Sequence, residues 1–136
     1  STAANPVVRA WEERKTVVPQ QVGYTIAEGV AVGAPGIKGD RALEAVRATE
    51  GLACSVDDAE IVDAMGQLAR AEGIWSGPTG AVTVAALVRL VKEKKIPSDA
   101  SAVCVVSETG LKGDFPPFPS EAQPLDAERI LRILER

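Results

Sequence analysis

Ser107, Glu108 and Thr109 are the residues of this sequence whose types and spacing are best suited to chemistry. They directly follow an apolar run, residues 102–106, whose composition predicts a buried strand. In a parallel α/β sheet, ligands bind beyond the carboxyl ends of the strands. Two hydroxyls and a carboxylate at such an edge could bind a polar ligand. A plain turn from strand to loop explains the same residues, and both interpretations stay open at this point.

A second candidate feature is the turn Gly77-Pro78-Thr79-Gly80, which precedes an apolar helical pattern. Backbone N–H groups at the beginning of a helix can bind an anion. Ordinary capping of the helix by Thr79 explains the same turn without a ligand. The run Gly33-Ala34-Pro35-Gly36 predicts a sharp turn of the chain rather than a phosphate cradle.

The composition excludes several classes of function. The 136 residues contain no histidine, which removes serine–histidine catalysis, histidine general bases and histidine metal sites. A formal charge of −4 argues against nucleic acid as a partner. No apolar run is long enough to span a membrane. Cys54 and Cys104 each lie in an apolar run, which predicts reduced core residues of a cytoplasmic protein and no metal site.

Short apolar strands alternate with helical patterns along the chain, which predicts an α/β fold with a mostly parallel sheet flanked by helices. Asp40 is expected to cap one helix, and Ser55, with Asp58 three residues later, is expected to cap the next, which ends at Gly73. The expected helices cover residues 6–14, 40–47, 56–72 and 78–91, and the expected strands cover 52–54 and 102–106. The helix 78–91 is apolar almost all round and is expected to be buried on more than one side.

The character of the sequence changes after Lys112, so we expect residues 1–112 to form the α/β domain. Residues 113–123 contain the run Phe115-Pro116-Pro117-Phe118-Pro119, which predicts an extended spacer. A proline-rich ligand for a recognition module is the alternative interpretation of that spacer. Residues 124–136, with Asp126 as the helix cap, predict a last helix that docks on the same domain.

Four segments, taken in order and with their spacing, resemble the C-terminal region of threonine synthases. They are Thr25-Ile26-Ala27-Glu28-Gly29-Val30-Ala31-Val32-Gly33, residues 51–61, residues 73–81, and residues 103–112 with Val106-Ser107-Glu108-Thr109-Gly110-Leu111-Lys112. The resemblance extends from about residue 5 to residue 112. No single segment is specific, and the resemblance depends on their succession. It implies fold type II of the pyridoxal-phosphate (PLP) enzymes, the tryptophan synthase β-like fold, in which this region completes the large domain.

The resemblance also implies roles for individual residues. Ser107 stands where this family has the serine or threonine that hydrogen-bonds the pyridine nitrogen of PLP, and Thr109 and Glu28 stand where they would line the cofactor site. A hydroxyl partner leaves that nitrogen largely unprotonated, which makes the ring a weaker electron sink. The resemblance implies elimination or replacement of phosphate on a small phosphorylated amino acid. Other phosphoserine-using relatives stay open, because Glu108-Thr109 stands where threonine synthases often carry glycine and a polar residue, and some relatives have a glutamate where Gly77 stands.

The lysine that binds PLP lies in the N-terminal half of this family, and the six lysines of this chain all stand at other positions. We therefore assign no catalytic residue and expect the chain alone to be inactive, with PLP bound only in the complete enzyme. Its expected partner is the missing N-terminal half or a second copy, because an isolated piece of sheet would expose an apolar edge. Two alternatives stay open, namely a stand-alone regulatory or ligand-binding α/β domain, and an unrelated α/β binding domain.

Overall fold

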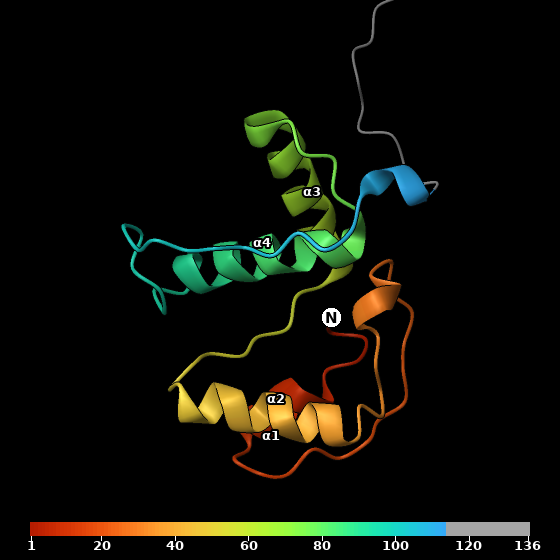
Figure 1. Cartoon of the computed structure of the whole chain (residues 1–136), viewed down its shortest axis with the longest axis vertical. Helices are drawn as coiled ribbons and strands as arrows, with labels where there is room; N and C mark the ends of the chain where they lie inside the picture. The colour runs from red at the N-terminus through yellow and green to blue at the C-terminus, as the bar shows by residue number, and fades with distance from the viewer. Residues whose placement is uncertain (114–136) are drawn as a thin grey trace, which may run out of the picture.

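The computed structural model of the chain describes residues 1–113. These residues form two pairs of packed helices joined by long irregular connections (Figure 1). In the first pair α1 packs against α2, and in the second pair α3 crosses α4. The helices are α1 (Pro6–Glu12), α2 (Ile37–Ala48), α3 (Asp58–Glu72) and α4 (Pro78–Lys92), with short 3₁₀ helices η1 (Glu28–Val30) and η2 (Gly110–Lys112).

The helix α3 begins with a capping box, but two residues later than the sequence indicated. The side chain of Asp57 accepts the N–H of Glu60, and the side chain of Glu60 accepts the N–H of Asp57. The expected cap at Ser55 is therefore wrong, because the pair Asp57/Glu60 satisfies both exposed amides reciprocally. The expected end of the helix at Gly73 is confirmed, since Gly73 adopts a left-handed conformation with φ 67°.

The helix α2 begins earlier than its expected cap, Asp40. The chain turns at Gly36, and the carbonyl of Gly36 accepts the N–H groups of Gly39 and Asp40. Asp40 therefore lies in the first turn, where its negative charge suits the helix dipole, and the expected cap at this residue is wrong.

The main core lies where α3 crosses α4. Ile61 and Val56 are among the most deeply buried side chains, and no residue from Pro78 to Val91 is fully exposed, so the expected burial of α4 on several sides is confirmed. Arg89 of α4 forms a two-bond ion pair with Glu60 of α3, with both distances 2.8 Å. The remaining buried members of this core are Ala27, Ala64, Met65, Leu68, Ala81 and Ala85.

The predicted parallel sheet is not present among residues 1–113. The segments 52–54 and 102–106 are irregular, and the single β-bridge in this part of the chain is antiparallel, between Ser76 and Thr109. Backbone groups form a strand only when a second strand lies beside them to complete the hydrogen bonds. Residues 102–106 instead run alongside α4, where the hydroxyl of Thr83 donates to the carbonyl of Val105 (Figure 1).

The segment 102–106 is also far more exposed than its apolar composition predicts. Val103 is 95% exposed and Val105 is 67% exposed, whereas Val106 packs partly against the core. Leu111, just beyond this segment, is 86% exposed. Three exposed aliphatic side chains on one short stretch form an apolar edge, which agrees with the expected exposure of apolar surface.

The expected boundary at Lys112 and the expected tail are not tested. The helix of residues 124–136, and the spacer 113–123 apart from Gly113, lie outside the described residues. Across residues 1–113, each helix is too short or too polar to cross a membrane.

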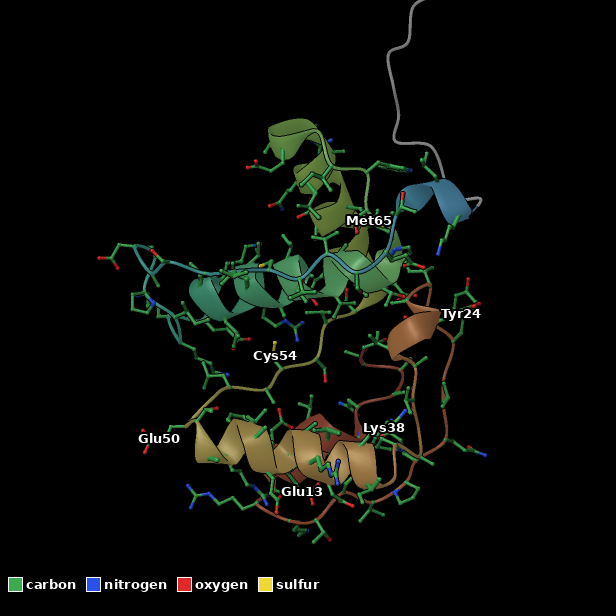
Figure 2. All side chains as sticks on the ribbon, viewed as in Figure 1. Glu13, Tyr24, Lys38, Glu50, Cys54 and Met65 are labelled. Carbon is green, nitrogen blue, oxygen red and sulfur yellow. The ribbon has the colours of Figure 1, made fainter. Side chains whose placement is uncertain are left out.

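Cys54 and Cys104 are free and half-buried, so neither is the fully buried core residue that its apolar surroundings predict. Cys54 lies on the connection between α2 and α3, between the two helix pairs (Figure 2). Burial raises the pKa of the Cys54 thiol, and the positive charge of Arg89 opposes this only in part. The neutral thiol is therefore favoured in the folded chain.

We expect Cys54 to react with iodoacetamide several-fold more slowly in the folded chain than in urea at about pH 8, because the thiolate is the nucleophile. Because the pKa of the Cys54 thiol is higher in the folded chain than in the unfolded chain, its ionisation also affects stability. Cys54 adds to the free energy of unfolding below the ordinary thiol pKa of about 8.5, and this contribution is lost as pH rises through the higher pKa of the folded chain. Peptide mass spectrometry measures the rate, and the Cys54→Ser variant isolates the signal of Cys104. Equal rates in the folded chain and in urea would contradict this prediction.

Candidate functional site

The segment that carries Ser107 is fastened to the turn before α4. The bridge between Ser76 and Thr109 brings residues 107–110 antiparallel to residues 75–77. The N–H of Gly77 donates to the carbonyl of Glu108 over 3.1 Å, and the N–H of Gly110 donates to the carbonyl of Trp75 over 2.9 Å. Two of the four segments that resemble threonine synthases therefore meet at the beginning of α4.

A buried hydroxyl lies at the centre of this junction. Ser76 is fully buried, and its hydroxyl oxygen lies 2.8 Å from the carbonyl oxygen of Gly77 and 3.3 Å from that of Glu108. A buried hydroxyl with polar partners stabilises the arrangement that supplies them, because losing a partner leaves an unsatisfied buried group. Ser76 thus holds the two segments at a fixed distance.

The first turn of α4 is capped by a residue distant in sequence. Gly77 is the N-cap and has no side chain, and Pro78 has no N–H to satisfy. The N–H of Thr79 donates to Oε2 of Glu108 over 2.9 Å. The expected capping by Thr79 is therefore wrong, and the amide at this helix end binds an anion that belongs to the chain itself.

The segment that carries Glu28 reaches the same helix end. The N–H of Gly29 in η1 donates to the hydroxyl oxygen of Thr79 over 3.2 Å. A Cβ atom on Gly29 would lie 2.8 Å from Cγ2 of Thr79, so a larger residue would displace the Thr79 side chain from this approach. Three of the four resembling segments therefore meet around the first turn of α4.

The fourth segment contributes through Asp58, at the beginning of α3. Oδ1 of Asp58 accepts the hydroxyl of the buried Thr25 over 2.5 Å, and Oδ2 accepts the N–H of Ile26 over 3.1 Å. The Thr25 hydroxyl oxygen in turn accepts the N–H of Ala27. Asp58 therefore fixes the residues that lead into Glu28, a role that sequence reasoning missed because it assigned Asp58 to helix capping.

The three residues expected to contact a cofactor differ in what they already bind. Ser107 is exposed, and its hydroxyl has no hydrogen-bond partner within residues 1–113. Thr109 is exposed, and its hydroxyl oxygen accepts the N–H of Leu111 over 3.4 Å. Glu28 is exposed in the first turn of η1. Their segments converge at α4, while no hydrogen bond joins the three side chains within the described part of the chain.

Sequence reasoning missed Glu108 as a structural partner of Thr79. A signal was present, because Glu108-Thr109 was expected to differ from threonine synthases and Gly77 from some of them. Glu108 and Gly77 lie against each other in the structure, where a Cβ atom on Gly77 would lie 2.6 Å from the carboxyl carbon of Glu108.

Comparison with known proteins identifies relatives of almost the whole chain. A family model described as pyridoxal-phosphate dependent enzyme matches residues 1–108. A threonine synthase from Methanocaldococcus jannaschii is 34% identical over 134 residues, which cover 98% of this chain and 33% of that protein. A threonine synthase from Methanosarcina acetivorans is 36% identical over 108 residues, which cover 79% of this chain and 26% of that protein. The first match also includes residues after 112, where the resemblance described in the sequence ends.

A solved structure shares the fold. The crystal structure of a threonine deaminase from T.th. matches with a TM-score of 0.52 and 22% identity, covering 66% of this chain and 32% of that chain. This match shows the α/β class, although no strand forms within residues 1–113. The chain spans about a third or less of the length of the curated relatives it matches.

Proposed function

The chain belongs to the pyridoxal-phosphate dependent enzyme family, and on this premise we propose that it is the C-terminal portion of a threonine synthase-like lyase. The contact between residues 107–110 and the beginning of α4 is the observation that carries the proposal. Together with the bond from Gly29 to Thr79, it brings three of the four segments by which the chain resembles threonine synthases to one helix end. The identities of 34% and 36% to threonine synthases support the same assignment.

The residues at this helix end fit the pyridine ring of PLP in one respect. Ser107 offers an exposed hydroxyl that has no partner within the described residues, so it is available to hydrogen-bond the ring nitrogen. A neutral hydroxyl stabilises an unprotonated nitrogen, whereas a carboxylate would favour the protonated form. When bound, PLP supplies the electron sink for breaking bonds at the carbon atoms of an amino acid. Thr109 and Glu28 would line the site beside Ser107.

The same residues do not fit covalent attachment of the cofactor. The segments that meet at α4, namely residues 25–30, 75–80 and 107–110, contain no lysine. We propose that a lysine from a preceding part of a longer protein completes the site, and that the chain alone is inactive. The chain spans 33% of the first relative, which leaves room for such a part.

The apolar edge, which consists of Val103, Val105 and Leu111, supports the proposal that this chain packs against another part of a longer protein. Aliphatic side chains exposed by 67% to 95% gain free energy when another surface covers them. We propose that the remainder of the longer protein covers this edge. Association of two copies of the chain is the competing outcome, and sedimentation of the chain at several concentrations separates the two.

The substrate that we propose is a small amino acid with a phosphorylated hydroxyl group, from which phosphate is eliminated and replaced. The similarity to threonine synthases favours this class. The carboxylates of Glu28 and Glu108 near the site would oppose binding of a second anion close to α4. The phosphate group is therefore expected to bind on the side supplied by the remainder of the protein.

Replacing Ser107 with alanine in the full natural gene product is expected to weaken PLP binding about tenfold, because one hydrogen bond to the ring nitrogen is lost. Titration followed by absorbance measures both the affinity and the spectrum of bound PLP. Ser107→Thr is the matched control, since it keeps the hydroxyl and should bind PLP as the parent does. Parent-like affinity and an unchanged spectrum in Ser107→Ala would remove Ser107 from the cofactor site.

A further inference from the structure

Glu108 is held in place by its main chain and its side chain at once. Its carbonyl accepts the N–H of Gly77 over 3.1 Å and lies 3.3 Å from the hydroxyl oxygen of Ser76. Its carboxylate accepts the N–H of Thr79 over 2.9 Å. The three partners are Ser76, Gly77 and Thr79, which lie in the turn before α4 and in its first turn. Glu108 therefore connects residues 107–110 to the beginning of α4 at three points.

The space for the carboxylate exists because residue 77 is glycine. A Cβ atom on Gly77 would lie 2.6 Å from Cγ, Cδ and Oε2 of Glu108. The backbone of Gly77 is extended, with φ −75° and ψ 167°, so alanine could adopt it without strain. The three atoms nearest to such a Cβ all belong to the Glu108 side chain. Gly77 and Glu108 are therefore a sterically matched pair.

We propose that Glu108 is a positioning residue, which orients the adjacent Ser107 by clamping residues 107–110 onto the first turn of α4. The Ser107 hydroxyl has no partner of its own within residues 1–113, so its direction depends on the backbone that carries it. That backbone is fixed on the C-terminal side of Ser107 by Glu108 and by the bond from Gly110 to Trp75. On the N-terminal side, the carbonyl of Val105 accepts the hydroxyl of Thr83. This inference rests on the proposed function only where it names Ser107 as the residue whose orientation matters.

Amide hydrogen exchange of the full chain tests the clamp without any cofactor. In Glu108→Ala, the amide of Thr79 loses its acceptor, and we expect its exchange to accelerate about tenfold. Clamping predicts more, namely that the amides of Gly77 and Gly110 also exchange faster, because both bonds join the two segments. Glu108→Gln keeps an acceptor oxygen and should restore most of the protection. Glu72→Ala, which removes a carboxylate from the exposed end of α3, is the charge-matched control.

A second variant disrupts the same contact by changing Gly77 instead of Glu108. Gly77→Ala leaves Glu108 intact but displaces its carboxylate, so it should accelerate exchange at Thr79 as Glu108→Ala does. In the double variant the two effects should not add, because the carboxylate can be lost only once. This variant also separates loss of the contact from a failure of the Glu108 variants to fold.

Faster exchange at Thr79 and Gly110 in both single variants, and at Gly77 in Glu108→Ala, with recovery in Glu108→Gln, is the expected result. Faster exchange at Thr79 alone would reduce Glu108 to a helix cap and overturn the positioning role. Unchanged exchange at all three amides would overturn the contact itself. The readout needs no PLP, so failure of the parent protein to bind PLP would reject the proposed function and leave this result standing.

PLP titration of the full natural gene product tests whether Glu108 affects cofactor binding through Ser107. Glu108→Ala should weaken PLP binding several-fold, and Glu108→Gln should restore it, because the clamp needs an acceptor oxygen rather than a charge. Parent-like affinity in Glu108→Ala, where the parent binds PLP, would contradict the positioning role.

Discussion

Replacing Ile61 with alanine is expected to lower the free energy of unfolding of the chain by about 3 to 4 kcal/mol, the largest effect that we expect from any single truncation. Ile61 is fully buried at the crossing of α3 and α4, within the cluster of buried apolar side chains that forms the main core. The loss combines the transfer free energy of the removed methyl and methylene groups with the cost of a cavity. Urea denaturation followed by circular dichroism measures the change.

Val62 is the matched control for this prediction. It is the next residue of the same helix and is 38% exposed, so Val62→Ala should cost less than about 1 kcal/mol. Equal losses for the two variants would place the core elsewhere than between α3 and α4.

Replacing Asp58 with alanine is expected to lower the free energy of unfolding by about 2 kcal/mol, because the hydroxyl of Thr25 and the N–H of Ile26 lose their acceptor together. Thr25 is buried, so its hydroxyl is left without easy access to water. The substitution should also loosen the segment that carries Glu28 in the candidate site, because Thr25 and Ile26 directly precede it. Exchange of the Ile26 amide, measured with the unfolding curve, should accelerate in the same variant.

Asp63→Ala is the control on the same helix. Asp63 is exposed and accepts the side-chain amide of Gln67 over 2.8 Å, so its loss should change the free energy of unfolding by less than about 0.5 kcal/mol. Asp58→Asn should fall between the two, because it keeps one acceptor oxygen. An Asp58→Ala variant as stable as Asp63→Ala would show that the Thr25 contact does not hold the segment.

The helices could be predicted from the sequence because their signals are local. The 3.6-residue apolar period and the glycine at residue 73 identified α3, and Pro78 with its apolar surroundings identified α4 to within one residue. The exact caps were missed where several capping residues lie close together, as with Ser55, Asp57 and Asp58. A cap is chosen by which side chain reaches the free amides, and sequence alone does not give that geometry.

The strands could not be predicted in the same way, because a strand is a property of two segments. The apolar run 102–106 has the composition of a buried strand, yet Val103 and Val105 are exposed and no strand lies beside them within residues 1–113. Periodicity does not report whether a partner strand belongs to the same stretch of chain. The same limit explains why Glu108 and Asp58 were missed as long-range hydrogen-bond partners, although the segments that carry Glu28, Ser107 and Thr109 were identified.

We propose that this chain is the C-terminal part of a PLP-dependent lyase. The most direct measurement is the intact mass of the natural gene product, together with its visible absorbance after PLP is added and its mass after borohydride reduction. We expect a product about three times as long as this chain, because the chain covers 33% of the first relative, with an absorbance band and a cofactor fixed covalently by reduction. A product that is no longer than this chain, with no band and no fixed cofactor, would contradict the account.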